Sequence, residues 1–107
     1  MVMKKVIYIY DNDRRSTGVW ASEKLIKSYQ GGDCEEVAVE IPDNLEPYET
    51  ETGDTMVKLG DYFYPLDECL RMDKNDHPYL KQMEPTGRAV KLKVVERIGR
   101  RSLAFTM

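Results

Sequence analysis

Residues 4–10 read KKVIYIY, a run rich in β-branched and aromatic side chains. In an extended chain, successive side chains point to opposite faces, which places Ile7 and Ile9 on one face and Tyr8 and Tyr10 on the other. Apolar residues on both faces are typical of a strand at the centre of a covered sheet. The sequence therefore predicts that residues 4–10 form a central, buried strand.

A helix is predicted over residues 17–30, shortly after this strand. Ser16 or Thr17 is suited to cap its N-terminus, and Gly31 and Gly32 are suited to end it. At about 100° per residue, the apolar side chains of this segment fall on one stripe, as expected of a helix that covers a sheet. That stripe consists of Val19, Ala21, Leu25, Ile26 and Tyr29.

The rest of the chain adds strands and one short helix. Residues 36–41 alternate between polar and apolar side chains, as a half-exposed strand does. Residues 56–64 turn at Gly60 and Asp61, which predicts a tight hairpin. Pro65 suits the first turn of a short helix over residues 65–72.

Together with a further strand over residues 89–98, these elements predict an α+β fold. We expect a single domain, residues 1–107, with a mixed sheet of five or six short strands, one main amphipathic helix and a short second helix. If the first two strands, within residues 4–41, are parallel, their helical connection should be right-handed.

The composition fits a soluble, intracellular domain. The chain has 107 residues, of which 41% are hydrophobic and 33% charged, so it can bury a core and is too apolar to be disordered. Cys34 and Cys69 form neither a CxxC pair nor a metal-ligand set, which favours a reducing compartment. No apolar run approaches the roughly 18 residues of a membrane span. We therefore expect a cytoplasmic protein without a membrane segment.

Charge is divided along the chain. Residues 33–61 hold ten acidic groups and one basic group, Lys58, whereas residues 88–107 hold six basic groups and one acidic group, Glu96. Local fields of this kind select binding partners. The leading hypothesis is an accessory or regulatory protein that binds another macromolecule, most simply a protein.

Two regions are candidates for that partner-binding surface. One is the acidic segment, residues 35–61, which contains Tyr48; its alternative interpretation is a solvated acidic face. The other is the face of the first predicted helix that carries Trp20, outside the apolar stripe. Tryptophans are frequent at binding hot spots, but packing under a neighbouring loop is the simpler interpretation of Trp20. The candidate residues are Trp20, Lys24, Lys27, Glu46, Tyr48, Glu49 and Glu51.

The alternative function is nucleic-acid binding by the basic strand and tail, residues 88–101, with tyrosines such as Tyr62 and Tyr64 stacking on bases. The low pI of about 5.2 argues against it, as does the acidic segment, which can neutralise the basic groups within the molecule. The candidate residues are Arg88, Lys91, Lys93, Arg97, Arg100 and Arg101.

The third hypothesis is a metal-dependent enzyme or ligand binder built on Asp11, Asp13 and His77. An ordinary turn explains the two aspartates, and a solvated loop explains the histidine, so no metal, cofactor or catalytic residue is predicted. Acidic neighbours favour inert thiols at Cys34 and Cys69, because negative charge raises a thiol's pKa.

Overall fold

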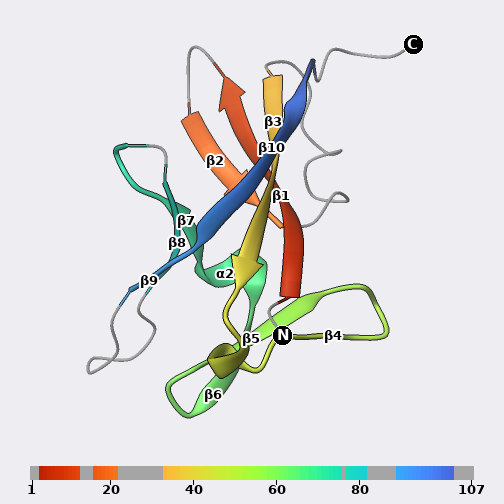
Figure 1. The fold of residues 1–107 in the computed structure, drawn as a ribbon, viewed down its shortest axis with the longest axis vertical. Helices are drawn as coiled ribbons and strands as arrows, with labels where there is room; N and C mark the ends of the chain where they lie inside the picture. Colours follow the sequence, from red (N-terminus) through yellow and green to blue (C-terminus); the bar gives the residue numbers. More distant parts are fainter. Residues whose placement is uncertain (1–2, 13–15, 22–32, 76, 82–88, 103–107) are drawn as a thin grey trace.

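The computed structural model describes residues 3–12, 16–21, 33–75, 77–81 and 89–102 (Figure 1). Its largest element is an antiparallel sheet in the strand order β10-β3-β1-β2. The four strands are β1 (Met3–Asn12), β2 (Ser16–Trp20), β3 (Asp33–Ile41) and β10 (Lys93–Ser102).

β1 lies inside this sheet, which confirms the prediction from the KKVIYIY run. Ile7 stands opposite Val37 of β3, and Ile9 stands opposite Val19 of β2. All four side chains are buried. The β-branched residues thus pack against one another across neighbouring strands, the arrangement in which they are most stabilising.

Two three-stranded antiparallel sheets complete the fold. The first has the order β4-β5-β6, and the second has the order β7-β8-β9. Their strands are β4 (Tyr48–Glu49), β5 (Thr55–Leu59), β6 (Tyr62–Pro65), β7 (Leu70–Met72), β8 (Pro78–Leu80) and β9 (Val90–Lys91). The helices are a 3-10 turn, η1 (Asp43–Leu45), and α2 (Leu66–Cys69).

The prediction of an α+β fold with a main amphipathic helix is wrong. Residues 16–20 form β2, and α2, with four residues, is the longest helix among the described parts of the chain. Val19 and Ala21 are both buried. Their spacing fits the alternation of a strand as well as the stripe of a helix, so the pattern did not distinguish the two. Residues 22–30 of the predicted helix lie outside the described residues.

The parallel arrangement considered for the first two predicted strands is wrong as well, because β1 and β3 are antiparallel neighbours. The strand over residues 36–41 and the hairpin over residues 56–64 are confirmed. The strand predicted over residues 89–98 is instead divided at Leu92 into β9 and β10, which belong to different sheets. The single mixed sheet of five or six strands is also wrong, because the described strands form three antiparallel sheets. The hairpin turns at Gly60, whose φ of 73° suits glycine, with Leu59 opposite Tyr62. The short helix forms as α2, but it ends at Cys69 and the chain continues as β7.

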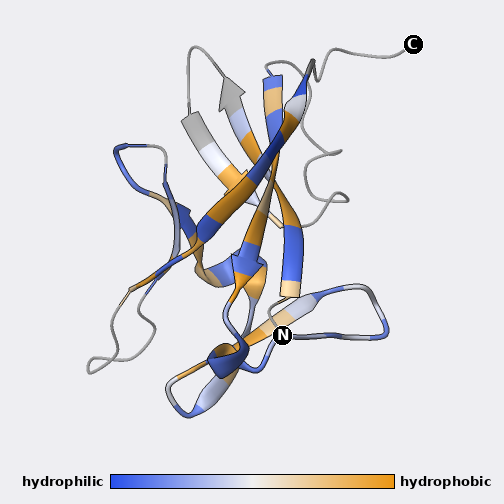
Figure 2. Ribbon diagram, in the orientation of Figure 1, coloured by the Kyte–Doolittle hydropathy of each residue, from blue (hydrophilic) through white to orange (hydrophobic). Residues whose placement is uncertain are grey.

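All three sheets contribute to one hydrophobic core, to which Val37, Val57 and Leu80 belong. A smaller cluster, Tyr10 and Cys34, lies on the other face of the four-stranded sheet. Figure 2 shows the hydrophobic middle of β1 and a mixture of hydrophobic and hydrophilic residues along β10. Apolar residues on both faces of β1 fit a strand that is covered on both sides.

The four-stranded sheet and the β7-β8-β9 sheet meet at both margins. Only Leu92 separates β9 from β10, so the chain passes from one sheet to the other almost without interruption. At the opposite margin β7 lies beside β2. The two sheets therefore curve round a shared core and leave one seam, between β2 and β7. No helix within the described parts of the chain is long and apolar enough to cross a membrane.

Candidate functional site

The β4-β5-β6 sheet turns one face to the core and the other outward. The residues Thr55, Val57 and Leu59 of β5 are buried. The side chains between them point the opposite way, and the strand register aligns them with residues of β4 and β6. We call this surface the outer face; it consists of Tyr48, Met56, Lys58, Phe63 and Pro65.

Two aromatic rings meet on the outer face. The ring centroids of Tyr48 and Phe63 lie 5.2 Å apart, with an angle of 72° between the ring planes, an edge-to-face arrangement. Tyr48 is nevertheless 45% exposed and Phe63 40% exposed. A pair of large apolar side chains held in place and open to solvent is typical of a binding surface.

Carboxylates surround the aromatic pair. Residues 43–68 hold eight acidic groups and one basic group, Lys58. A carboxylate oxygen of Glu46 lies 3.3 Å from Nζ of Lys58, and a carboxylate oxygen of Glu49 lies 3.7 Å from Nζ of Lys5 in β1. Both glutamates stay more than half exposed, and exposed ion pairs of this kind exchange readily because they contribute little energy. The negative charge of the segment is therefore open to a partner.

The turn between β4 and β5 is ordered by its own polar groups. The backbone N–H of Thr50 donates to the carbonyl of Asp54 at 2.8 Å, and the N–H of Gly53 donates to the carbonyl of Thr50 at 3.0 Å. The hydroxyl of Thr52 donates to the carboxylate of Asp54 at 3.0 Å. These bonds hold the exposed Glu51 at the tip of the turn, beside β4.

The second predicted partner-binding region is placed differently from its prediction. Trp20 lies in β2 rather than on a helix, opposite Tyr8 of β1. It is partly buried and packs against the cluster of Tyr10 and Cys34. Lys24 and Lys27 lie outside the described residues, and a binding role for this group stays a prediction.

The predicted basic stripe is divided by the fold and faces carboxylates. Arg97 Nη1 lies 2.8 Å from an oxygen of Glu35, and the same glutamate stands opposite Arg100 across the strands. Lys93 stands opposite Glu40. Because these carboxylates face the basic groups, they lower the positive potential along β10. This weakens the hypothesis of nucleic-acid binding.

The remaining basic residues of the predicted stripe either lie outside β10 or have side chains outside the described part of the chain. Lys91 belongs to β9, in a different sheet from β10. Arg88 and the side chain of Arg101 lie outside the described residues. Nucleic-acid binding therefore stays a prediction.

His77 takes part in a local turn. The backbone N–H groups of Asn75 and His77 donate to the same oxygen of Asp73, at 2.8 and 2.9 Å. The hydrogen bond from His77 is the main cause that lowers the pKa of Asp73, and the nearby Lys91 lowers this pKa further. The imidazole Nδ1 lies 3.8 Å from the other oxygen of Asp73. This is the geometry of a turn that an aspartate stabilises.

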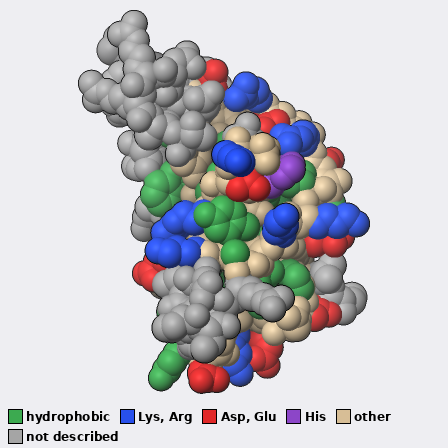
Figure 3. Space-filling model, turned by 90° about the vertical axis from the view of Figure 1, so that its left-hand side faces the viewer, with side chains coloured by type: hydrophobic (Ala, Val, Ile, Leu, Met, Phe, Trp, Pro, Cys, Tyr) green, Lys and Arg blue, Asp and Glu red, His purple; other side chains and the backbone are tan. Residues whose placement is uncertain are grey.

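The described residues around His77 form no metal site. A hollow of about 420 Å³ beside it is lined by apolar side chains such as Pro78 and Leu92, with Glu96 and Arg97. Figure 3 shows hydrophobic side chains on this face, with the single histidine and charges of both signs around them. Within the described part of the chain, no three His, Cys, Asp or Glu residues are grouped as metal ligands. Asp13 and the side chain of Asp11 lie outside it.

The two cysteines are buried and unbridged. The thiol of Cys69 lies 3.5 Å from the carbonyl of Leu66, to which it can donate a hydrogen bond. Its pKa is raised to about 11, chiefly by burial, and the neighbouring Glu68 and Asp67 contribute smaller upward shifts. At neutral pH the Cys69 thiol therefore stays protonated and a poor nucleophile. Burial, more than the acidic neighbours on which the sequence prediction rested, is the cause.

Phe63 is the member of the site that the sequence interpretation missed. Its signal was present in the hairpin itself, because a turn at Gly60 and Asp61 places Phe63 opposite Lys58, on the face away from Val57.

No model of a known protein family matches the chain, and the comparisons with curated proteins and with solved structures find no significant match.

Proposed function

We propose that this protein acts by binding a basic segment of a partner protein on the outer face of the β4-β5-β6 sheet. The observation that carries the proposal is the exposed edge-to-face pair of Tyr48 and Phe63 inside a strongly acidic part of the chain. Apolar anchors supply most of the affinity of an interface, and charge complementarity speeds encounter and selects the partner.

The chemistry of the face favours arginine on the partner. A guanidinium group packs on aromatic rings and pairs with carboxylates at the same time. Tyr48 and Phe63 offer the rings, and Glu46 offers a carboxylate whose present partner, Lys58, is itself exposed. An arriving arginine can replace Lys58 without leaving a buried charge unpaired, so the exchange carries little desolvation penalty.

The experiment is a calorimetric titration with two synthetic peptides, one of alternating arginine and leucine and one of alternating glutamate and leucine. We expect saturable binding of the arginine peptide alone, which weakens as salt rises. Replacing both rings, in the variant Tyr48→Ala with Phe63→Ala, should weaken binding on the order of tenfold or more.

The matched control is Tyr62→Ala. Tyr62 is 66% exposed and lies on the same hairpin, but it stands opposite Leu59 and so does not belong to the outer face. This variant should bind as the unmodified protein does. Equal losses for Tyr62→Ala and the double variant, or equal binding of both peptides, would contradict the proposal.

A further inference from the structure

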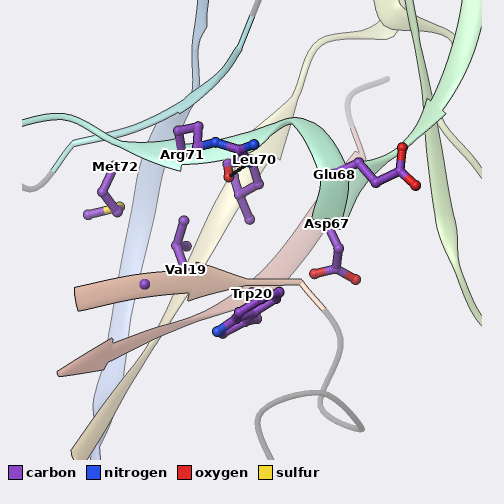
Figure 4. A pocket seen from close by; sticks show the side chains of 8 residues that line it. Val19, Trp20, Asp67, Glu68, Leu70, Arg71 and Met72 are labelled. Carbon is purple, nitrogen blue, oxygen red and sulfur yellow. Dashed lines mark hydrogen bonds between the residues drawn. The ribbon is translucent and has the colours of Figure 1, made fainter. Parts of the chain in front are cut away.

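A groove of about 530 Å³ lies along the seam between β2 and the α2–β7 segment (Figure 4). Val19 on one side and Leu70 on the other are both buried and give it an apolar floor. Asp67 and Glu68 lie at one end of the groove, and Met72 lies at the other. A space of this size falls in the range of ligand sites, about 300–1,000 Å³.

The two edges of the four-stranded sheet differ in how they are protected. The β10 edge carries Lys93, Arg97 and Arg100 and has two breaks in its register with β3. Charges and bulges are the devices by which natural proteins prevent another strand from pairing. β2 reads STGVW, without a charged residue or a proline, and its register with β1 is unbroken.

The neighbour of β2 at this edge is β7, the edge strand of the other sheet. Because the two strands belong to different sheets, no ladder of hydrogen bonds joins them among the described residues. β7 has only three residues. The seam is therefore the place where the backbone of another extended chain can be added with the least disturbance of existing pairs.

We propose that the β2 edge binds an extended peptide of a partner protein, which pairs with β2 and places a basic side chain beside Asp67 and Glu68. In such strand addition the main chain gives affinity and the side-chain contacts give selectivity. For the peptide to pair with β2, β7 has to move away from β2.

The acidic end of the groove sets the charge of the peptide. The carboxylate of Asp67 is held in place, because it accepts a hydrogen bond from the backbone N–H of Ala21. Glu68 is exposed. The one cation lining the groove among the described residues is Arg71, whose Nη1 donates to the carbonyl of Leu70 at 2.8 Å. A lysine or arginine of the peptide therefore meets two carboxylates at the α2 end.

The experiment uses nuclear magnetic resonance on the full-length protein and a synthetic probe of sequence KVTVTVK. We expect shifts of the amide signals of β2 and β7 and slower hydrogen exchange in β2 as the probe is added. A probe of the same sequence, N-methylated at alternate residues, has lost the donors of one edge and should bind on the order of tenfold more weakly.

Charge is tested with the probe EVTVTVE, which should bind several-fold more weakly than the lysine probe at low salt. The substitution Glu68→Gln should narrow this difference. Equal binding of the methylated probe, shifts at β10 instead of β2, or no saturable binding of KVTVTVK would overturn the proposal. So would protection of β2 that grows with protein concentration without any probe, which would assign the edge to a second copy of this chain.

This site shares no residue with the outer face, so the two proposals fail separately. The double variant Tyr48→Ala with Phe63→Ala should bind KVTVTVK as the unmodified protein does.

Discussion

Tyr48 and Phe63 meet edge to face although their strands are not neighbours, because β5 lies between β4 and β6. The contact spans the outer face above Met56, which stands opposite Tyr48. It ties the two-residue strand β4 to the hairpin and orders both rings.

We first predict that the two rings stabilise the fold cooperatively. In a double-mutant cycle with Tyr48→Leu and Phe63→Leu, urea unfolding should give a coupling free energy of about 0.5 kcal/mol, the low end for aromatic pairs because both rings are exposed. Strictly additive effects of the two substitutions would show that the rings do not interact in solution.

The buried thiol of Cys69 predicts a loss of stability in alkaline solution. The folded-state pKa is raised from 9.0 to about 11, so the thiol stays protonated in the folded protein while the unfolded chain ionises. Stability from this group is complete below pH 9 and is lost between pH 9 and 11, by at most about 2–3 kcal/mol. The free energy of unfolding of Cys69→Ala should fall less over this range. If the free energy of unfolding had the same pH dependence in both proteins, the loss of stability would not come from Cys69.

The register of β3 with β10 predicts weak binding of nucleic acid. Glu35 and Glu40 stand opposite Arg100 and Lys93, so the unmodified protein should not bind single-stranded DNA at physiological salt. Neutralising both carboxylates, in Glu35→Gln with Glu40→Gln, should permit binding at low salt that weakens steeply as salt rises. Fluorescence anisotropy of a labelled oligonucleotide measures the binding by the unmodified protein and by the variant. Tight, salt-sensitive binding by the unmodified protein would instead support the basic strand as a functional surface.

The turn of the β5–β6 hairpin depends on Gly60. Its φ of 73° lies in the left-handed region, where a side chain costs about 1–2 kcal/mol. Gly60→Ala should therefore lower the free energy of unfolding by about that amount, and Gly60→Asn by less, because asparagine tolerates this conformation. A neutral effect of Gly60→Ala in thermal or urea unfolding would mean that the turn has a different geometry.

The strands could be predicted where the local pattern admitted one interpretation. The run of residues 4–10, the alternation of residues 36–41 and the turn at Gly60 each specify a strand or hairpin without reference to the rest of the chain. Val19 and Ala21 do not, because both are buried and their spacing fits a helical stripe as well as the alternation of a strand. What selects the strand is pairing with β1, a contact that the segment itself does not reveal.

The candidate site was predicted in part for a similar reason. Glu46, Tyr48 and Glu49 were identified because acidic residues are dense there in the sequence. Phe63 was missed because its contact with Tyr48 depends on β4 joining the hairpin, a pairing set by the fold. The nearness of Lys5 to Glu49 likewise joins two segments far apart in the chain.

We propose that the outer face binds a basic partner through Tyr48 and Phe63. The most direct measurement is a map of amide chemical shifts of the full-length protein titrated with the peptide of alternating arginine and leucine. We expect saturable shifts at Tyr48, Lys58 and Phe63 that disappear in the variant with both rings replaced by alanine. The absence of saturable shifts at these outer-face residues, or shifts there that persist unchanged in that variant, would contradict the proposal.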